Sequence, residues 1–334
     1  MQPQWPAEWS PHRAIWVGFP SHADLWQENL DAAQDEAAGL ARALAGPGGE
    51  RVRLFVCGEA AEAAARRRLE GAGGVEIVRG FFGDIWLRDT GPIFLGGGDR
   101  TVASSFRFNG WGGKYVLDDD DTVAEQLAAA AGAPLKPHDF VLEGGAIEGD
   151  GEGTLLTTRQ CVLNPNRNPG WDEAKAEASL GLALGLRTVL WLGDGLMNDH
   201  TDGHVDNLAR FVAPGVVACP VAFGRDDPNA EVYDACAAAL SGMKDARGVG
   251  LQVMRVPSPG RMLDEEGEVI PASHMNFVIA NEAVICPTYN ERTASYALEA
   301  LAAIFPEREV IGLPSRALLT GGGSFHCITQ QEPA

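Results

Sequence analysis

Five side chains with covalent or acid–base chemistry lie beside glycines or turn residues. Cys327 follows a triple glycine and Ser-Phe-His, His204 and Asp206 are two residues apart, Asp89 precedes Thr-Gly-Pro, and Glu143 precedes two glycines. A thiolate with a nearby imidazole as proton carrier is typical of covalent catalysis at an electrophilic carbon. Three carboxylates would disfavour an oxyanion, but they match the planar fork of N–H donors of a guanidinium group. The set therefore suits covalent catalysis on a substrate whose reacting group carries positive charge, such as a guanidinium.

Each of these residues also has an ordinary structural interpretation. Asp89 lies in a turn-forming sequence, Glu143 fits an exposed loop acid, and Cys327 fits a small buried side chain. His204 alone would be a hydrogen-bonded structural histidine, and with Asp206 it would suit a metal site that lacks its other ligands. A catalytic role is favoured because a repeat in the sequence places all five residues at equivalent positions.

The repeat is a unit of two short strands, a helix and a further strand. Polar, Gly-rich segments enter short apolar strands and tight turns, which is typical of β-hairpins, at 86–108, 140–158, 204–220, 274–287 and 321–330. Alanine-rich segments with helical spacing lie between them, at 32–45, 122–131, 172–184, 229–243 and 294–304. Most of these are followed by one more apolar run, at 52–56, 188–192, 251–256 and 310–313.

Units of this ββαβ kind cannot bury their apolar faces alone, so we expect five of them to pack around a common centre. No linker or charge block marks a boundary, which favours one closed domain over residues 1–334. The start of each hairpin would point into the centre, and the fourth start carries His274 and Asn276. Because residues two apart in a strand face the same side, we expect His204 and Asp206 to project from a strand into one cavity.

The charge of the chain limits its partners. The 26 basic and 46 acidic residues give a net charge of −20. Binding to nucleic acids or to anionic membrane surfaces requires clustered Lys and Arg on the protein, so we expect no binding to either. The negative charge favours a cationic ligand, although solubility alone also accounts for it.

The cysteines and the amino terminus indicate a cellular compartment. The first residues lack the basic and apolar regions of a signal peptide, and no apolar run approaches the ~20 residues of a membrane span. Six cysteines are scattered without a CxxC pair, so we expect neither a disulfide framework nor a zinc site. A cytoplasmic protein with reduced thiols follows. Apart from Cys327, the cysteines are interpreted as small core residues: Cys57, Cys161, Cys219, Cys236 and Cys286.

Seven ordered motifs carry a family resemblance that runs nearly end to end. They are 6–12 (PAEWSPH) with Trp16, 86–92 (WLRDTGP), 109–113 (NGWGG), 142–145 (LEGG), 163–168 (LNPNRN), 201–206 (TDGHVD) and 321–331 (GGGSFHCITQQ). With these motifs the sequence resembles the agmatine deiminase family, also called the bacterial-type peptidylarginine deiminase family, of the guanidine-group-modifying superfamily. The resemblance implies an α+β fold, the five-bladed α/β propeller or pentein, with pseudo-fivefold ββαβ repeats around a central active site.

The resemblance also implies a role for each reactive residue. Cys327 would attack the guanidinium carbon, while Asp89 and Asp206 would clamp the guanidinium nitrogens. His204 would protonate the departing ammonia and then activate water against an S-alkylthiouronium intermediate. Glu143 would pair with His204 and keep its imidazolium available as an acid. Neither a metal nor an organic cofactor is implied.

Two further residues are expected to contact the substrate. Trp86 resembles the aromatic wall of the pocket, where an indole can stack on a planar cation. Many agmatine-specific members read Asp-Glu-Thr-Asp-Gly-His before the catalytic histidine, whereas residues 199–204 here read DHTDGH. His200 therefore replaces an acid, which would weaken recognition of a distal amine if that acid contacts it. The alternative is that His200 is a surface loop residue.

The resemblance implies a C–N hydrolase that converts agmatine and water to N-carbamoylputrescine and ammonia, on a route to putrescine. The partner is a small cationic guanidino substrate, and a homo-oligomer remains open. Deimination of peptidylarginine or of another guanidino amine is the first alternative. Amidino transfer or dimethylarginine hydrolysis would use the same fold, and a non-catalytic polyamine-binding protein is a more remote alternative.

Overall fold

The computed structural model describes residues 4–334, whose strands form five small mixed sheets. In each sheet an antiparallel strand pair is extended by a parallel strand. Four sheets contain β4 (Ile93–Leu95), β5 (Val102–Arg107) and β6 (Leu135–Val141); β7 (Ile147–Gly149), β8 (Thr154–Thr158) and β9 (Thr188–Leu192); β10 (Arg210–Ala213), β11 (Val216–Val221) and β12 (Gln252–Pro257); and β13 (Val278–Ile279), β14 (Ala283–Thr288) and β15 (Glu309–Pro314).

The fifth sheet joins the two ends of the chain. Its order is β16 (Thr329–Pro333), β1 (His12–Gly18), β2 (Val52–Cys57) and β3 (Val75–Gly80), and Trp16 lies opposite Gln330 across the antiparallel pair. The predicted hairpin within 321–330 is therefore wrong. The partner of the last strand comes from the other end of the chain, which a search for local turn signals does not detect.

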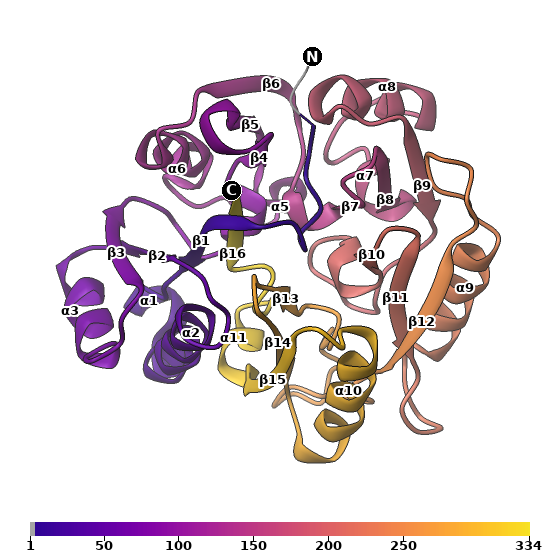
Figure 1. Ribbon diagram of the computed structural model, residues 1–334. Helices are drawn as coiled ribbons and strands as arrows, with labels where there is room; N and C mark the ends of the chain where they lie inside the picture. The colour runs from indigo at the N-terminus through magenta and orange to yellow at the C-terminus, as the bar shows by residue number, and fades with distance from the viewer. Residues whose placement is uncertain (1–3) are drawn as a thin grey trace.

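The five long helices form where alanine-rich periodicity predicts them, and Figure 1 shows them on the outside of the sheets. Each follows the middle strand of its unit and returns the chain to a parallel strand, as a crossover connection requires. They are α2 (Leu30–Ala45), α6 (Val123–Ala131), α8 (Glu173–Leu184), α9 (Ala230–Ser241) and α10 (Glu291–Ile304). The Asp172 side chain caps α8 by accepting from the Lys175 amide. The additional helix α3 (Glu59–Arg68), which leads into β3, was not predicted.

Short helical turns, most of them between the long elements, complete the structure. They are α1 (Ala23–Trp26), α4 (Leu87–Thr90), α5 (Gly110–Gly113), α7 (Arg159–Val162), α11 (Arg316–Thr320), η1 (Gln27–Asn29), η2 (Gly98–Arg100), η3 (Asp120–Thr122), η4 (Gly144–Ala146) and η5 (Val205–Asn207). Three of them, α4, η4 and η5, each lie just before the first strand of a sheet. They sit where the reactive residues of the sequence lie.

The expectation that His204 and Asp206 project from a strand is wrong. Asp206 lies within η5 and His204 precedes it, while β10 begins only at Arg210. The amides of Leu208 and Ala209 bond to the Val205 carbonyl, so these backbone groups close a turn instead of joining a ladder. The reactive residues therefore lie on tight turns before the strands, at equivalent points of successive units.

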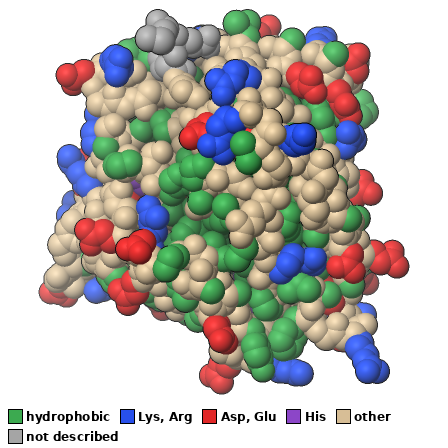
Figure 2. Space-filling model, turned by 45° about the vertical axis from the view of Figure 1, so that its right-hand side comes forward, with side chains coloured by type: hydrophobic (Ala, Val, Ile, Leu, Met, Phe, Trp, Pro, Cys, Tyr) green, Lys and Arg blue, Asp and Glu red, His purple; other side chains and the backbone are tan. Residues whose placement is uncertain are grey.

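The interior contains large apolar clusters together with buried charged side chains, several of which form ion pairs. Trp16, Phe55 and Leu40 lie in the largest buried apolar cluster, which packs α2 against β1 and β2. Figure 2 shows a face on which acidic and basic side chains are scattered and hydrophobic side chains gather between them. Among residues 4–334, no helix has both the length and the apolar character needed to cross a bilayer.

Candidate active site

The structure brings the five predicted reactive side chains into one buried cluster. Each is at most 6% exposed. The Cys327 Sγ lies 3.7 Å from Asp206 Oδ2. His204 lies between the other two carboxylates, with Nδ1 3.7 Å from Asp89 Oδ2 and Nε2 3.7 Å from Glu143 Oε2. A thiol, an imidazole and three carboxylates thus share a site to which four different units contribute.

Glycines allow these turns to approach so closely. The Gly145 amide donates to Asp89 Oδ1 at 2.9 Å. A Cβ at Gly145 would lie 2.6 Å from His204 Nδ1 and 2.9 Å from Asp89 Oδ1, which real Cβ atoms essentially never do. The triple glycine before the thiol has the same use, because a Cβ at Gly323 would lie 2.5 Å from the Trp86 ring.

The Cys327 thiol is held by Asn276, from the turn before β13. Its Sγ accepts from Asn276 Nδ2 at 3.1 Å, and the Asn276 Oδ1 accepts from the backbone amides of His326 and Cys327. Burial, together with the negative charges of Asp206 and Asp89, raises the pKa of the Cys327 thiol well above its ordinary value. In the unliganded protein the thiol therefore keeps its proton at neutral pH.

Asp206 is positioned with one oxygen free. Its Oδ2 accepts from His326 Nδ1 at 2.8 Å and from Asn276 Nδ2 at 3.2 Å, whereas its buried Oδ1 has no hydrogen-bond partner. Burial opposes the ionised form, but His326, His204 and Arg210 outweigh it and lower the pKa of Asp206. A buried anionic oxygen without a donor is costly. The site thus presents an acceptor that a cationic N–H donor would satisfy.

Glu143 and His204 form a charged pair. Burial favours neutral groups, but the charge of Asp89 and contacts with Cys161 and Glu143 outweigh it and raise the pKa of His204 well above its ordinary value. The pKa of Glu143 is lowered despite burial, because His204 and Arg167 favour its ionised form. The imidazolium is therefore available as an acid at neutral pH.

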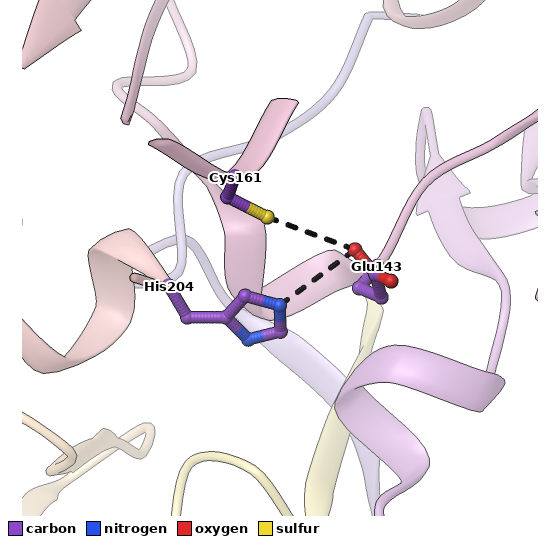
Figure 3. Close-up of side chains that lie close together, drawn as sticks. All are labelled: Glu143, Cys161 and His204. Atoms are coloured by element: carbon purple, nitrogen blue, oxygen red, sulfur yellow. Dashed lines mark hydrogen bonds and ion pairs between the residues drawn. The ribbon is translucent and has the colours of Figure 1, made fainter. Parts of the chain in front are cut away.

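Cys161 and Arg167 are contacts of this pair that the sequence interpretation missed. Cys161 is buried, as predicted, but it is not a plain core thiol: its Sγ donates to Glu143 Oε2 at 3.8 Å, and Figure 3 shows Cys161 and His204 both directed toward Glu143. Arg167 Nε donates to Glu143 Oε1 at 2.9 Å. Arg167 lies within the motif at 163–168, for which the sequence indicates no role, and no local pattern distinguishes Cys161.

An open cavity of about 360 Å³ leads to the thiol. Cys327, Asp89, Trp86 and Trp111 are among the residues that line it. The Trp86 indole is 5% exposed and lies 6.2 Å, centroid to centroid, from the ring of Trp26. Trp111 Nε1 donates to Asp89 Oδ2 at 2.9 Å. Aromatic walls with carboxylates at the inner end suit a flat organic cation.

His200 lies at the mouth of this cavity. It is exposed, and it lines both the 360 Å³ cavity and an adjoining cavity of about 1280 Å³. Tyr115 Oη is 3.4 Å from His200 Nδ1, and the two rings are 5.9 Å apart. Glu28 also lines both cavities, and its carboxylate forms no hydrogen bond or ion pair with the residues that the structure describes. The mouth therefore combines an imidazole with a free carboxylate.

Within residues 4–334, two groups of side chains have the spacing of metal ligands. They are Glu143, Cys161 and His204, and Glu8, Glu148 and His326. In both, guanidinium groups already compensate the carboxylates: Arg167 pairs with Glu143, and Arg210 pairs with Glu8 and Glu148. A divalent cation would sit beside a fixed positive charge in either place, so ion pairing describes these groups better than metal ligation.

Comparison with known proteins places the chain in a family. The model of the Porphyromonas-type peptidyl-arginine deiminase family matches residues 4–333. The agmatine deiminase of Pseudomonas aeruginosa (strain LESB58) is 38% identical over 357 residues, covering 98% of this chain and 95% of that protein. A structure of the agmatine deiminase of Enterococcus faecalis catalysing its reaction has a TM-score of 0.92 at 32% identity, covering 99% and 95% of the two chains.

A more distant structure shares the fold alone. It is SxtG, an amidinotransferase from Microseira wollei in a saxitoxin biosynthetic pathway, with a TM-score of 0.56 at 12% identity over 98% of this chain and 96% of that one. The mixed α/β fold of small sheets is thus shared with a protein of low sequence identity, whereas the sequence itself matches the deiminase family over nearly the whole chain. This chain belongs to the Porphyromonas-type peptidyl-arginine deiminase family.

Proposed function

We propose that this protein hydrolyses agmatine to N-carbamoylputrescine and ammonia, with Cys327 as the nucleophile. The observation that carries the proposal is that Asp206 Oδ1 is buried without a hydrogen-bond partner. The other oxygen of this carboxylate, Oδ2, lies 3.7 Å from the Cys327 thiol. A guanidinium is a cation whose parallel N–H groups satisfy such an unpartnered oxygen. Asp206 and Asp89 clamp its nitrogens, so that the carbon faces Cys327.

Substrate binding activates the thiol. The carboxylates of Asp206 and Asp89 hold the proton on Cys327 in the empty site. A bound guanidinium neutralises these charges, so the thiol pKa falls and the proton leaves to solvent. The cationic substrate thereby generates its own nucleophile.

The chemistry proceeds in two steps that share His204. The thiolate electron pair forms the C–S bond to the guanidinium carbon, and one C–N bond then breaks as the imidazolium of His204 gives its proton to the departing ammonia. The remaining S-alkylthiouronium is attacked by water, whose proton His204 accepts. The C–S bond breaks, which releases the ureido product and restores Cys327.

The mouth of the cavity would receive the distal amine of agmatine. Glu28 offers a carboxylate there, and His200 stands where many agmatine-specific relatives have an acid. We assign the amine contact to this region and the stacking contact on the guanidinium to Trp86. The agmatine deiminases among the similar proteins favour agmatine over the alternative, which is peptidylarginine or another guanidino amine.

We further propose that the five sheets are the blades of an α/β propeller about a pseudo-fivefold axis, and that residues 1–334 form one domain. The common strand order and the equivalent positions of α4, η4 and η5 support this. We place the enzyme in the bacterial cytoplasm, on a route to putrescine. The bacterial agmatine deiminases among its relatives support this placement.

A substrate panel tests the proposal. The protein is incubated with agmatine, free arginine and an arginine-containing peptide, and both ammonia and the ureido product are measured, with Cys327→Ala as the control. We expect N-carbamoylputrescine from agmatine and little turnover of the other two compounds. No ammonia from any of them would contradict the deiminase function. If citrulline formed mainly in the peptide, peptidylarginine and not agmatine would be the substrate.

A further inference from the structure

We propose that Arg167 is a positioning residue that fixes the Glu143–His204 pair to the loop at the cavity mouth, residues 198–203, which we call the mouth loop. The inference deepens the proposed deimination and rests on it. Arg167 touches neither Cys327 nor the cavity in the described structure. Its effect on the reaction must therefore pass through the groups that its guanidinium holds.

The first of these groups is the carboxylate beside the catalytic imidazole. Arg167 is 4% exposed, and its Nε donates to Glu143 Oε1 at 2.9 Å. The other oxygen of the same carboxylate, Oε2, faces His204 Nε2 at 3.7 Å. One carboxylate thus joins two cations, and Arg167 fixes its orientation from the side opposite the imidazole.

The remaining donors of Arg167 hold the mouth loop. Nη2 donates to the Thr201 carbonyl at 2.8 Å, and Nη1 donates to the Asp202 carboxylate. Lys114 Nζ reaches the same loop, at 2.5 Å from Asp202 Oδ1 and 2.8 Å from the His200 carbonyl. The planar guanidinium has five N–H donors, so it can bond to a carboxylate on one side and to the mouth loop on the other. The ammonium group of a lysine lacks this rigid fork of donors.

The mouth loop needs such support because its backbone is strained. Asn198 and Asp202 have φ angles of +59° and +64°, in the left-handed region that non-glycine residues rarely adopt. Conformations of this kind persist only when surrounding contacts impose them, and they cluster at functional sites. The loop carries His200 at the cavity mouth and leads directly into His204. A single buried guanidinium therefore holds both the part of the loop that leads into His204 and the carboxylate that faces the His204 imidazole.

The charge of Arg167 adds to its geometry. Glu143 is fully buried, and burial by itself would favour a neutral carboxyl. With Arg167 and His204 on either side, the pKa of Glu143 is lowered instead. Without Arg167, Glu143 would be a buried anion with one cationic partner, and the imidazolium would lose a fixed orientation for delivering its proton.

The first test does not depend on activity. Hydrogen exchange of the peptide spanning 198–204 is compared in the full-length wild type, Arg167→Gln and Arg167→Lys. The matched control is Arg66→Gln, an exposed arginine that pairs with Glu62 on its own helix, α3. We expect faster exchange in Arg167→Gln, an intermediate rate in Arg167→Lys, and wild-type exchange in the control. Exchange in Arg167→Gln equal to that in the control would overturn the link to the mouth loop.

The second test separates positioning of the acid from general damage. Ammonia needs a proton from His204 to leave, whereas methanethiol does not, so agmatine is compared with the S-methylisothiourea of the same diamine. Both compounds give the same covalent intermediate on Cys327. We expect Arg167→Gln to lower kcat/KM for agmatine about 100-fold, the low end of a general-acid effect, and to change it less than about tenfold for the analogue.

The outcomes are distinguishable. Equal losses for the two substrates, or no loss for either, would overturn the positioning role, and circular dichroism and Tm identify a variant that fails to fold. Arg167→Lys, which keeps the charge but not the fork, should lie between wild type and Arg167→Gln for agmatine. If the wild type released no ammonia from agmatine, the proposed function would fail, while the exchange experiment would still decide whether Arg167 anchors the mouth loop.

Discussion

Asp206→Asn should change the two reactivities of Cys327 in opposite directions. The carboxylate repels a thiolate electrostatically, but it also attracts the guanidinium that the thiolate attacks. The amide keeps the shape of the side chain, and its oxygen can replace Oδ2 as the acceptor for His326 and Asn276. The variant therefore removes the charge while leaving the positioning contacts in place.

The magnitudes follow from the geometry. Two unit negative charges 3.7 Å apart, the separation of Cys327 Sγ and Asp206 Oδ2, repel by about 4.5 kcal/mol at an effective dielectric constant of 20. Relaxation reduces this value, but about 1.4 kcal/mol suffices for a tenfold effect. We therefore expect iodoacetamide, which is neutral, to alkylate Cys327 at least about tenfold faster in Asp206→Asn at neutral pH. The pH dependence of alkylation should shift to lower pH.

Turnover should fall in the same variant. Removing one partner of a buried ion pair costs about 3–5 kcal/mol, which corresponds to a loss of at least about 100-fold in kcat/KM for agmatine. Alkylation is followed by peptide mass spectrometry at Cys327, because Cys57 is partly exposed and will also react. Asp226→Asn, a change at an exposed carboxylate that pairs with Arg261, is the control. Unchanged or slower alkylation, or agmatine turnover within threefold of wild type, would refute the reasoning.

Three further predictions concern packing, pH and specificity. Gly145→Ala should lower kcat more than about 100-fold, because its Cβ would lie 2.6 Å from His204 Nδ1, whereas Gly193→Ala, with open space around it, should be active; equal activities would contradict the close packing. Burial raises the pKa of Asp120 from 3.8 to about 6, so the folded state binds a proton that the unfolded state has lost. This group's contribution to the free energy of unfolding therefore falls as pH rises from about 4 to about 6. Urea unfolding across that range should show a smaller decline in this free energy for Asp120→Asn than for the wild type. Glu28→Gln should raise KM for agmatine but not for n-butylguanidine, which lacks the amine, and His200→Glu should lower KM for agmatine; an unchanged KM would remove that residue from amine recognition.

The sequence was most informative where local pattern and chemistry coincide. The long helices follow from alanine-rich periodicity. The equivalent positions of the sequence repeat also identify Cys327, Asp89 and Glu143 as candidates for one site. The structure brings these residues together with His204 and Asp206. Repeated units place equivalent residues at equivalent points, so this grouping was accessible without coordinates.

The missed features depend on specific hydrogen bonds and contacts that composition does not record. β1 pairs with β16 from the other end of the chain, and no local signal marks such a pairing. The repeated hairpin pattern predicts a strand that begins at His204, but the hydrogen bonds that close a turn at Val205 are invisible in composition. Cys161 was interpreted as a core thiol because its neighbours are apolar; its contact with Glu143 comes from a residue 18 positions away.

Covalent catalysis by Cys327 requires a bond between its sulfur and the guanidinium carbon during turnover. The most direct measurement is the mass of the Cys327 peptide after the enzyme, turning over agmatine, is quenched in acid. We expect this peptide to carry the added mass of agmatine less ammonia and the adduct to disappear when substrate is exhausted. Cys327→Ala should show neither adduct nor turnover. Ammonia release at a wild-type rate by Cys327→Ala, or an adduct on a different residue, would contradict covalent catalysis by Cys327.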